Sequence, residues 1–452
     1  MPTTERSATT SSSSTLHGSS PWRVAIALLV AGLALGFAVR LPALGWLGLV
    51  LTSYAIATPL RNRALHAGLV AASSLVASLL RFGFVWPGLR LYGAGDDAAI
   101  GALGLGTSIG IVDRLPIVLV LVLTPMKHRA RVLGTTPLWM PSAWLLGERG
   151  MAWVTTMALN GWLLTQAGTP PVVHLVSWIG QTPTALIALT LGAVFGTAVV
   201  HREKRALIAA SALALASLAI PARHTDARAL QGVAALRLQR RADQVRNLDA
   251  TLIVWPEGIS RRRVSLEEGA VDVQVTPPGT TPATHVMGIL NRRGDRIQNS
   301  AIAMTNEGHV YWHRAKIALA GMGEETRFGI RLGNDQDYLR GEIDPVVRVG
   351  ERRVGVLICS EVFDADMRER ATPEGVDLVL VLAGDSITGD EASGRDLMLN
   401  AAILAAAEQG VSIARASLRG VAALIGPDGT VYARVDSGHL HAAVMPAPST
   451  AP

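Results

Sequence analysis

Three ionisable side chains each follow an apolar, strand-like run in the second half of this 452-residue chain: Glu257, Lys316 and Cys359. The carboxyl ends of parallel strands meet at one edge of a sheet, so side chains far apart in the sequence can lie together there. Cys359 is the only cysteine in the chain, and a lone cysteine after a strand is also typical of a small buried apolar residue. The occurrence of all three residues at strand ends favours a chemical role.

A carboxylate, an ammonium group and a thiol are the parts of a nucleophilic site. A thiol becomes a strong nucleophile when a neighbouring base takes its proton. Glu257 can be that base if burial raises its pKa towards neutrality. Lys316 would stabilise the thiolate and then the oxyanion of a tetrahedral intermediate, with the backbone N–H of Ser360 as a second donor. The residue types therefore predict covalent catalysis through a thioester on Cys359.

Strand-like and helix-like runs alternate around these residues, as in a layered α/β domain. We expect this domain to cover residues 222–446 and to be followed by a short tail, 447–452. An alanine-rich helix precedes its last strands. The predicted strands are 228–233, 249–255, 285–290, 300–306, 309–312, 354–358, 376–382, 411–416 and 421–425, and the predicted helices are 236–246 and 395–408.

The first half of the chain is far more apolar than the second. Hydrophobic residues make up 49% of the whole chain and charged residues 17%, and long apolar runs concentrate in residues 22–221. Residues 1–21, rich in Ser and Thr, are predicted to be a disordered tail. Apolar runs of this length are typical of membrane helices. We predict a transmembrane domain of about seven helices, at 22–39, 41–60, 66–87, 98–125, 132–147, 173–200 and 206–221.

Basic residues cluster in alternate connections between these runs, at 61–63, 127–131 and 201–205. Cytoplasmic loops of membrane proteins carry such an excess of Lys and Arg. With these loops inside, seven spans place the N-terminus in the cytoplasm and the α/β domain outside it. The same rule accounts for the net charge of +6, so nucleic acid is not a predicted partner.

Two further features of the first half have alternative interpretations. Asp113 and Arg114 fall inside an apolar run, where a charge marks a functional site by default, but an adjacent pair of opposite sign also fits a structural role, which we favour. Trp153 and Trp162 lie in the predicted outer loop 148–172. Tryptophan commonly anchors a chain at the membrane–water boundary, and the alternative is that the two line an entry for a lipid substrate.

The order of the motifs resembles that of a known family. Trp255-Pro256-Glu257, the later Lys316, Gly323-Glu324 and Ile358-Cys359-Ser360-Glu361 resemble the nitrilase, or carbon–nitrogen hydrolase, superfamily with its Glu-Lys-Cys triad. An apolar half ahead of such a domain resembles one branch, the bacterial apolipoprotein N-acyltransferases. The resemblance implies an αββα four-layer sandwich behind a polytopic α-helical membrane domain, in the bacterial inner membrane with the catalytic domain on the periplasmic side. It also implies a helper role for Glu324. Glu361 is either a supporting residue behind the site or a residue at a helix start that the helix dipole favours, and we favour the supporting role.

The chain departs from this branch in the loops that handle lipid. Ser360 stands where the family usually has tyrosine, and the segment 383–389 has no aromatic residue where the family has several. The loop that carries Lys316 is also altered. These departures leave the thioester chemistry in place and leave the acyl donor and acceptor open.

Three functions follow as expectations. The first is a membrane-bound N-acyltransferase that moves a fatty acyl group from a phospholipid through the Cys359 thioester to the amine of a lipoprotein or another acceptor. The second is a membrane-tethered amidase of the same superfamily, with water as acceptor. The third is a non-catalytic nitrilase-like membrane protein, such as those associated with conjugal transfer. No cofactor or metal ion is predicted for any of them.

Overall fold

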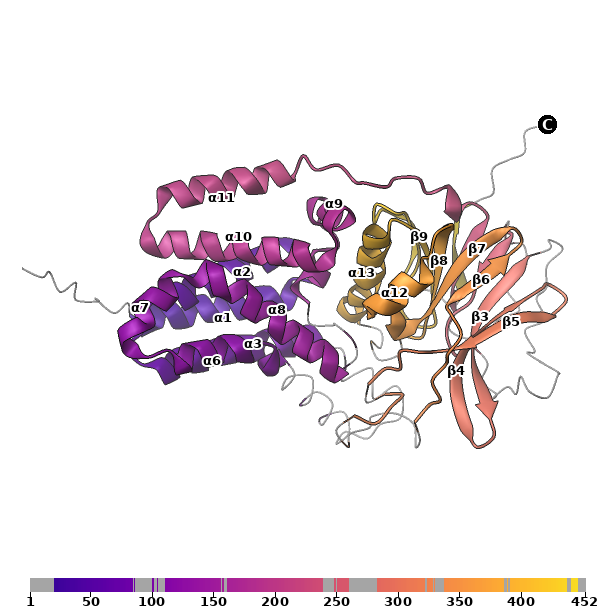
Figure 1. Ribbon diagram of the computed structural model, residues 1–452, viewed down its shortest axis with the longest axis horizontal. Helices are drawn as coiled ribbons and strands as arrows, with labels where there is room; N and C mark the ends of the chain where they lie inside the picture. The colour runs from indigo at the N-terminus through magenta and orange to yellow at the C-terminus, as the bar shows by residue number, and fades with distance from the viewer. Residues whose placement is uncertain are drawn as a thin grey trace, which may run out of the picture.

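A computed structural model of the chain describes most of both halves (Figure 1). The described residues are 20–83, 85, 100, 104, 110–155, 157, 161–238, 248, 250–259, 283–321, 323–327, 329, 337–385, 388, 391–436 and 440–445. Predictions for nearly all of the N-terminal tail, much of the segment 383–389 and the C-terminal tail therefore lie outside the described residues.

Every one of the seven predicted apolar runs contains a helix. The run 173–200 contains two, because Gly180, with φ +84, separates them. A helix also forms in the basic cluster 127–131. The helices of this half are α1 (Pro21–Phe37), α2 (Pro42–Ala57), α3 (Arg63–Phe82), α6 (Leu115–Leu123), α7 (Met126–Gly134), α8 (Thr136–Thr155), α9 (Pro170–Ile179), α10 (Gln181–His201) and α11 (Lys204–Ser217), with a 3₁₀ turn η1 (Trp162–Gln166).

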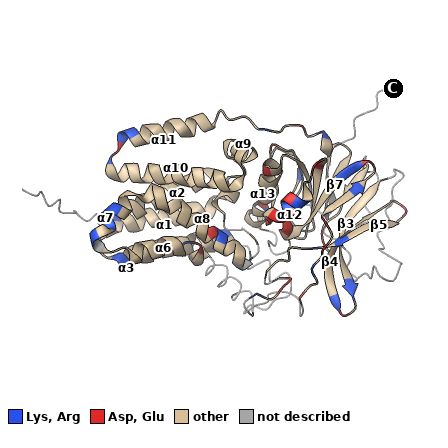
Figure 2. Cartoon of the chain, in the orientation of Figure 1, with Lys and Arg blue, Asp and Glu red and all other residues tan. Residues whose placement is uncertain are grey.

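Two helices among the described residues have the length and apolarity needed to cross a membrane: α3 with 20 residues and α10 with 21. The apolar helices α1, α2 and α9 are shorter. The basic clusters lie at the end of this helical half that points away from the sheet, around α7 and the start of α11 (Figure 2). A domain of seven spans with a fixed orientation stays a prediction.

The charged pair in the helical half is buried. The Asp113 carboxylate and the Arg114 guanidinium form an ion pair with each other, and Arg114 stacks 3.4 Å from the ring centroid of Trp144. The arrangement agrees with the structural interpretation of this pair.

The interpretation of the two tryptophans as interface anchors is wrong for Trp162. Its side chain is 1% exposed, and its indole N–H donates to the Gly45 carbonyl at 3.1 Å. A buried indole that finds an acceptor loses little on leaving water, so Trp162 serves as a packing residue. Trp153, by contrast, is 66% exposed, as an anchor would be.

The second half forms one continuous sheet in the order β5-β4-β3-β2-β1-β9-β8-β7-β6, to which β10, β11 and β12 add pairs. The strands from β3 through β2, β1, β9 and β8 to β7 are parallel neighbours. Their bounds are β1 (Val233–Leu238), β2 (Leu252–Val254), β3 (Thr284–Arg293), β4 (Arg296–Met304), β5 (Val310–Ala315), β6 (Val346–Val349), β7 (Arg352–Ile358), β8 (Val376–Ala383), β9 (Ser412–Ser417), β10 (Ala422–Ile425), β11 (Val431–Val435) and β12 (Leu440–Met445).

The sequence prediction is wrong at the start of this sheet. Residues 228–230 form a short 3₁₀ turn, η2 (Arg228–Leu230), and the strand runs from Val233 to Leu238, where we expected a helix from Leu236 onwards. The apolar run 233–236 is drawn into the sheet because β1 lies at its centre between β2 and β9, buried on both faces. The remainder of the predicted helix, 239–246, lies outside the described residues.

The sheet folds over so that its two ends face each other across an apolar core. Val254 and Val286 from one end pack in the same cluster as Val356 and Leu380 from the other. The alternate residues of β7 and β8 point outward, towards two helices, α12 (Ala365–Ala371) and α13 (Ala392–Gln409). Among the described residues, one helix layer therefore packs against two sheet layers. These are three of the four layers of the predicted αββα sandwich.

Helix α13 lies between the sheet and the helical half (Figure 1). On the helical side, the Asn400 amide donates to the Leu164 carbonyl at 2.8 Å, and the Gln181 backbone N–H donates to Glu408 at 2.9 Å. Glu408 also pairs with Arg368 of α12 at 2.8 Å. These polar contacts, together with the apolar packing of α13, join the two halves.

Candidate active site

The structure brings the three predicted residues to one place. Glu257 follows β2, Lys316 follows β5 and Cys359 follows β7. Cys359, Glu257 and Lys316 lie close enough to act electrostatically on one another. A carboxylate, an ammonium and a thiol therefore meet beyond strand ends, which is the arrangement that nucleophilic catalysis requires.

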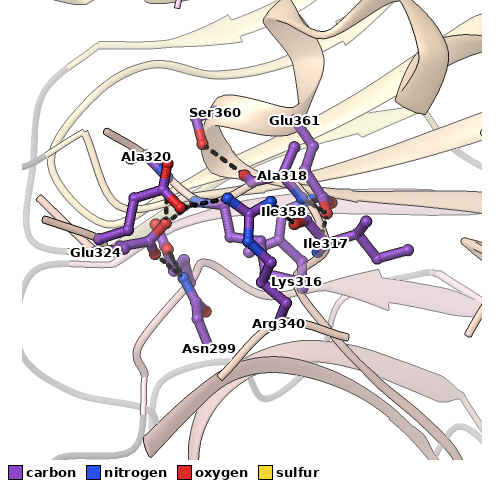
Figure 3. Close-up of polar contacts among 12 residues, drawn as sticks. Asn299, Lys316, Ile317, Ala318, Ala320, Glu324, Arg340, Ile358, Ser360 and Glu361 are labelled. Carbon is purple, nitrogen blue, oxygen red and sulfur yellow. Dashed lines mark hydrogen bonds and ion pairs between the residues drawn. The ribbon is translucent and has the colours of Figure 1, made fainter. Parts of the chain in front are cut away.

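The predicted helper Glu324 binds Lys316 directly. Its Oε2 lies 2.8 Å from Lys316 Nζ and accepts the Ala320 backbone N–H at 2.7 Å (Figure 3). Burial disfavours the charge of Lys316, but the carboxylates of Glu324 and Glu257 outweigh it and raise the pKa of Lys316. Lys316 therefore carries a positive charge at neutral pH.

Cys359 sits on a sharp turn between β7 and a 3₁₀ turn, η4 (Cys359–Phe363). Its φ is +49, a conformation that costs a residue other than glycine about 1–2 kcal/mol. The turn separates the half-buried thiol from the buried strand before it. Such strain persists only where neighbouring contacts hold the backbone.

Glu361 supplies those contacts. Its carboxylate accepts the backbone N–H of Ile358 at 2.8 Å and of Ile317 at 2.7 Å, and it is ion-paired with the fully buried Arg314. Burial alone would raise the pKa of Glu361, but Arg314 and the backbone donors lower it below its ordinary value. The Glu361 carboxylate thus ties the turn of Cys359 to the loop after Lys316.

Burial decides the protonation of the thiol and of its base. Burial and the nearby Glu257 carboxylate raise the pKa of Cys359, and Lys316 only partly opposes them, so the resting group is a thiol. Burial also raises the pKa of Glu257 against the opposing charge of Lys316. A carboxylate whose pKa moves towards neutrality can take the thiol proton during attack and return it later.

Ser360 is nearly fully buried, and its hydroxyl donates to the Ala318 carbonyl at 3.4 Å. The Ser360 side chain therefore points towards the loop that follows Lys316 (Figure 3). The role of its backbone N–H as an oxyanion donor stays a prediction.

Sequence reasoning missed three polar residues of the site. Asn299 of β4 donates from Nδ2 to Glu257 and Glu324, and Arg314 of β5 holds Glu361. Asp385, after β8, has φ +50, is ion-paired with Arg415 and acts electrostatically on Cys359. Asn299 lies in β4 and Arg314 lies in β5. A polar residue within a strand-like run was the sequence signal that could have identified both as site residues.

Gly288 determines the position of the Glu257 backbone. A Cβ at residue 288 would lie 2.5 Å from Glu257 Cα, and the Gly288 N–H donates to the Pro256 carbonyl at 3.1 Å. We predict that Gly288→Ala displaces Glu257 and lowers kcat/KM roughly 10²-fold, since a shift of about 1 Å in a catalytic group has effects of that size. Steady-state kinetics would measure this.

The matched control is Gly134→Ala, because the added methyl group meets open space there. Equal losses for the two variants would show that Gly288 has no special place in the site.

Comparisons with known proteins give similarities of fold only. No family model and no curated protein sequence matches the chain. Among solved structures, an amidase from Nesterenkonia sp. is 21% identical with a TM-score of 0.37, covering 50% of this chain and 92% of its own. A mutant of the Nesterenkonia AN1 amidase from the nitrilase superfamily is 20% identical with a TM-score of 0.36, covering 48% and 92%.

A third solved structure, a glutamine-dependent NAD+ synthetase from Acinetobacter baumannii, is 18% identical with a TM-score of 0.38 and covers 46% of this chain and 44% of its own. What the site of the present chain can do follows from its own geometry. Each of these similarities covers about half of this chain.

Proposed function

We propose that the chain is a membrane-bound N-acyltransferase that works through a thioester on Cys359. The observation that carries the proposal is the meeting of the Cys359 thiol with the Glu257 carboxylate and the Lys316 ammonium. The thiol is protonated at rest and is paired with a base whose pKa lies above its ordinary value. Such a pair is suited to forming and breaking an acyl thioester.

In the first half-reaction, Glu257 takes the Cys359 proton while the sulfur attacks the carbonyl carbon of an acyl ester. Lys316 stabilises the oxyanion that forms. The intermediate collapses, the ester C–O bond breaks, and Glu257 returns the proton to the leaving alcohol. In the second half-reaction an amine attacks the thioester, its proton passes through Glu257 to the sulfur, and an amide leaves. The sum is ester plus amine to amide plus alcohol.

The helical half supports a lipid substrate. It contains two helices with the length and apolarity to cross a membrane, and helix α13 of the sheet half packs against it. An enzyme joined to a bilayer in this way is placed to take a phospholipid as acyl donor and a lipoprotein amine as acceptor. We further propose the bacterial inner membrane as its location, with the basic end cytoplasmic and the site periplasmic.

The test uses cells depleted of their own apolipoprotein N-acyltransferase. Expression of the chain should restore an N-acyl group on a lipoprotein N-terminus, seen by mass spectrometry, and the Cys359→Ala variant should not. A free amine in both strains would contradict the acyltransferase. Full restoration by Cys359→Ala would favour the non-catalytic alternative.

A second candidate, a membrane-tethered amidase, is favoured by Ser360. This residue stands where the lipid-handling branch usually has tyrosine, and its short side chain is turned towards Ala318. With water as acceptor, the same site would hydrolyse an amide and release ammonia or an amine. Amine release from small amides that Cys359→Ala abolishes, together with an unmodified lipoprotein, would favour this candidate over acyl transfer.

A further inference from the structure

Asn299 is the one side chain that touches both carboxylates of the site among the residues that the structure describes. Its Nδ2 donates to Glu257 Oε1. It also donates to Glu324 Oε1 at 2.6 Å (Figure 3). An amide NH₂ has two hydrogens, so both bonds can form at the same time. The side chain is 1% exposed, and a flipped amide would turn its oxygen towards two carboxylates. The two carboxylates therefore determine which way the Asn299 amide is turned.

The backbone holds Asn299 in this place. It belongs to β4, and its carbonyl accepts the Lys316 backbone N–H at 2.7 Å. The strand that carries Asn299 thus also positions the residue that carries the ammonium. On its other side β4 pairs with β3, which contains the Gly288 that supports Glu257. The strand of Asn299 therefore lies between β5, which leads to Lys316, and β3, which contains Gly288.

The charges at the site explain why a neutral donor is needed there. The titratable groups that act on Glu257 are Lys316, Glu324 and Cys359. Two carboxylates face one ammonium, and Glu324 holds that ammonium at 2.8 Å. Glu257 is left with weaker compensation, and the donor at Asn299 favours its charged form.

We infer that Asn299 is a positioning residue that keeps Glu257 an unprotonated acceptor turned towards the Cys359 thiol and couples it to the Glu324–Lys316 pair. The inference rests on the proposed function only in taking Glu257 as the base for Cys359. It does not depend on whether the substrate is an ester or an amide.

The experiment measures the alkylation of Cys359 by iodoacetamide as a function of pH. Cys359 is the only cysteine, so the mass of the intact chain reports on this thiol alone. In the unmodified protein the alkylation rate should fall at acidic pH as Glu257 takes up a proton. We call this falling part of the pH profile the acidic limb. The variant Glu257→Gln should lack that limb.

The informative variant is Asn299→Asp, which keeps the shape of the side chain and replaces the donor by a carboxyl group. Loss of a hydrogen bond to a charged group, and a further negative charge when the introduced carboxyl group ionises, both favour the protonated form of Glu257. We expect the acidic limb to move up by about one to two pH units. Asn299→Ala removes the donor without adding charge and should move the limb in the same direction by less, which covers the case in which Asn299→Asp does not fold.

The matched control is Asn291→Asp on β3. Asn291 is also buried, and its amide donates to Gln298 instead of to the carboxylates of the site. The control should leave the limb where it is in the unmodified protein. A limb that moves equally in both variants, or in neither Asn299 variant, would overturn the inference.

The outcomes separate this inference from the proposed function. An alkylation limb that Glu257→Gln removes and Asn299→Asp shifts supports the positioning role, even if the acyltransferase and amidase assays are both silent. A rate that does not depend on Glu257 overturns both the base assignment and the inference.

Discussion

Replacing Cys359 by alanine should reduce turnover by at least roughly 10⁴-fold, to the level that binding and oxyanion stabilisation alone provide. The reason is that the thioester cannot form without the sulfur, whichever acceptor completes the reaction. The measurement is kcat with a substrate that the unmodified protein turns over, together with mass spectrometry for a covalent acyl adduct on the chain. The adduct should be present in the unmodified protein under slow turnover and missing in Cys359→Ala.

Ser412→Ala is a suitable control for this substitution. Ser412 is a buried first residue of β9, and the change removes one heavy atom, as Cys359→Ala does. Its hydroxyl has no hydrogen-bond partner among the described residues, so the loss should be within a few-fold of the unmodified activity. Comparable activity of the two variants would show that the sulfur does not form the covalent intermediate.

The second large effect is on stability. We expect Glu361→Gln to lower the free energy of unfolding by about 3–5 kcal/mol, because it leaves the guanidinium of Arg314 buried without its counter-charge. Both side chains are fully buried, so water does not compensate. Chemical unfolding of the detergent-solubilised chain, followed by tryptophan fluorescence, would measure the change.

The pH dependence of this contribution has a definite sign. The folded-state pKa of Glu361 lies below the ordinary glutamate value, so the unfolded chain binds the proton more readily. The stabilisation is therefore fully present above the unfolded-state pKa and is lost as the pH falls through the folded-state pKa. Glu361→Gln should flatten this acid limb of the stability profile.

A surface pair provides the comparison. Asp344 is paired with Arg370 at 2.7 Å but is 77% exposed, so Asp344→Asn should cost less than about 1 kcal/mol. If the two variants lost the same stability, burial of the Arg314–Glu361 pair would not be the source of the effect.

Much of the site could be predicted from local patterns. Strand-like runs end shortly before Glu257, Lys316 and Cys359 in the sequence, and the chemistry of a carboxylate, an ammonium and a thiol limits what such a set can do. The start of the sheet could not be predicted in this way. Residues 233–238 have a composition that suits a helix or a strand, and their place between β2 and β9 makes them a strand.

The sequence by itself therefore determined which three residues are the candidates for the chemistry, because side-chain type and strand ends are local properties. The tertiary structure alone decided their surroundings. Asn299 and Arg314 act on groups tens of positions away, and they reach them only because β4 and β5 lie in the same folded sheet. The positive φ of Cys359 likewise depends on the Glu361 contacts that span two segments of the chain. Hydrogen bonds and burial of this kind set the protonation of the triad, and they exist only once the strands are packed.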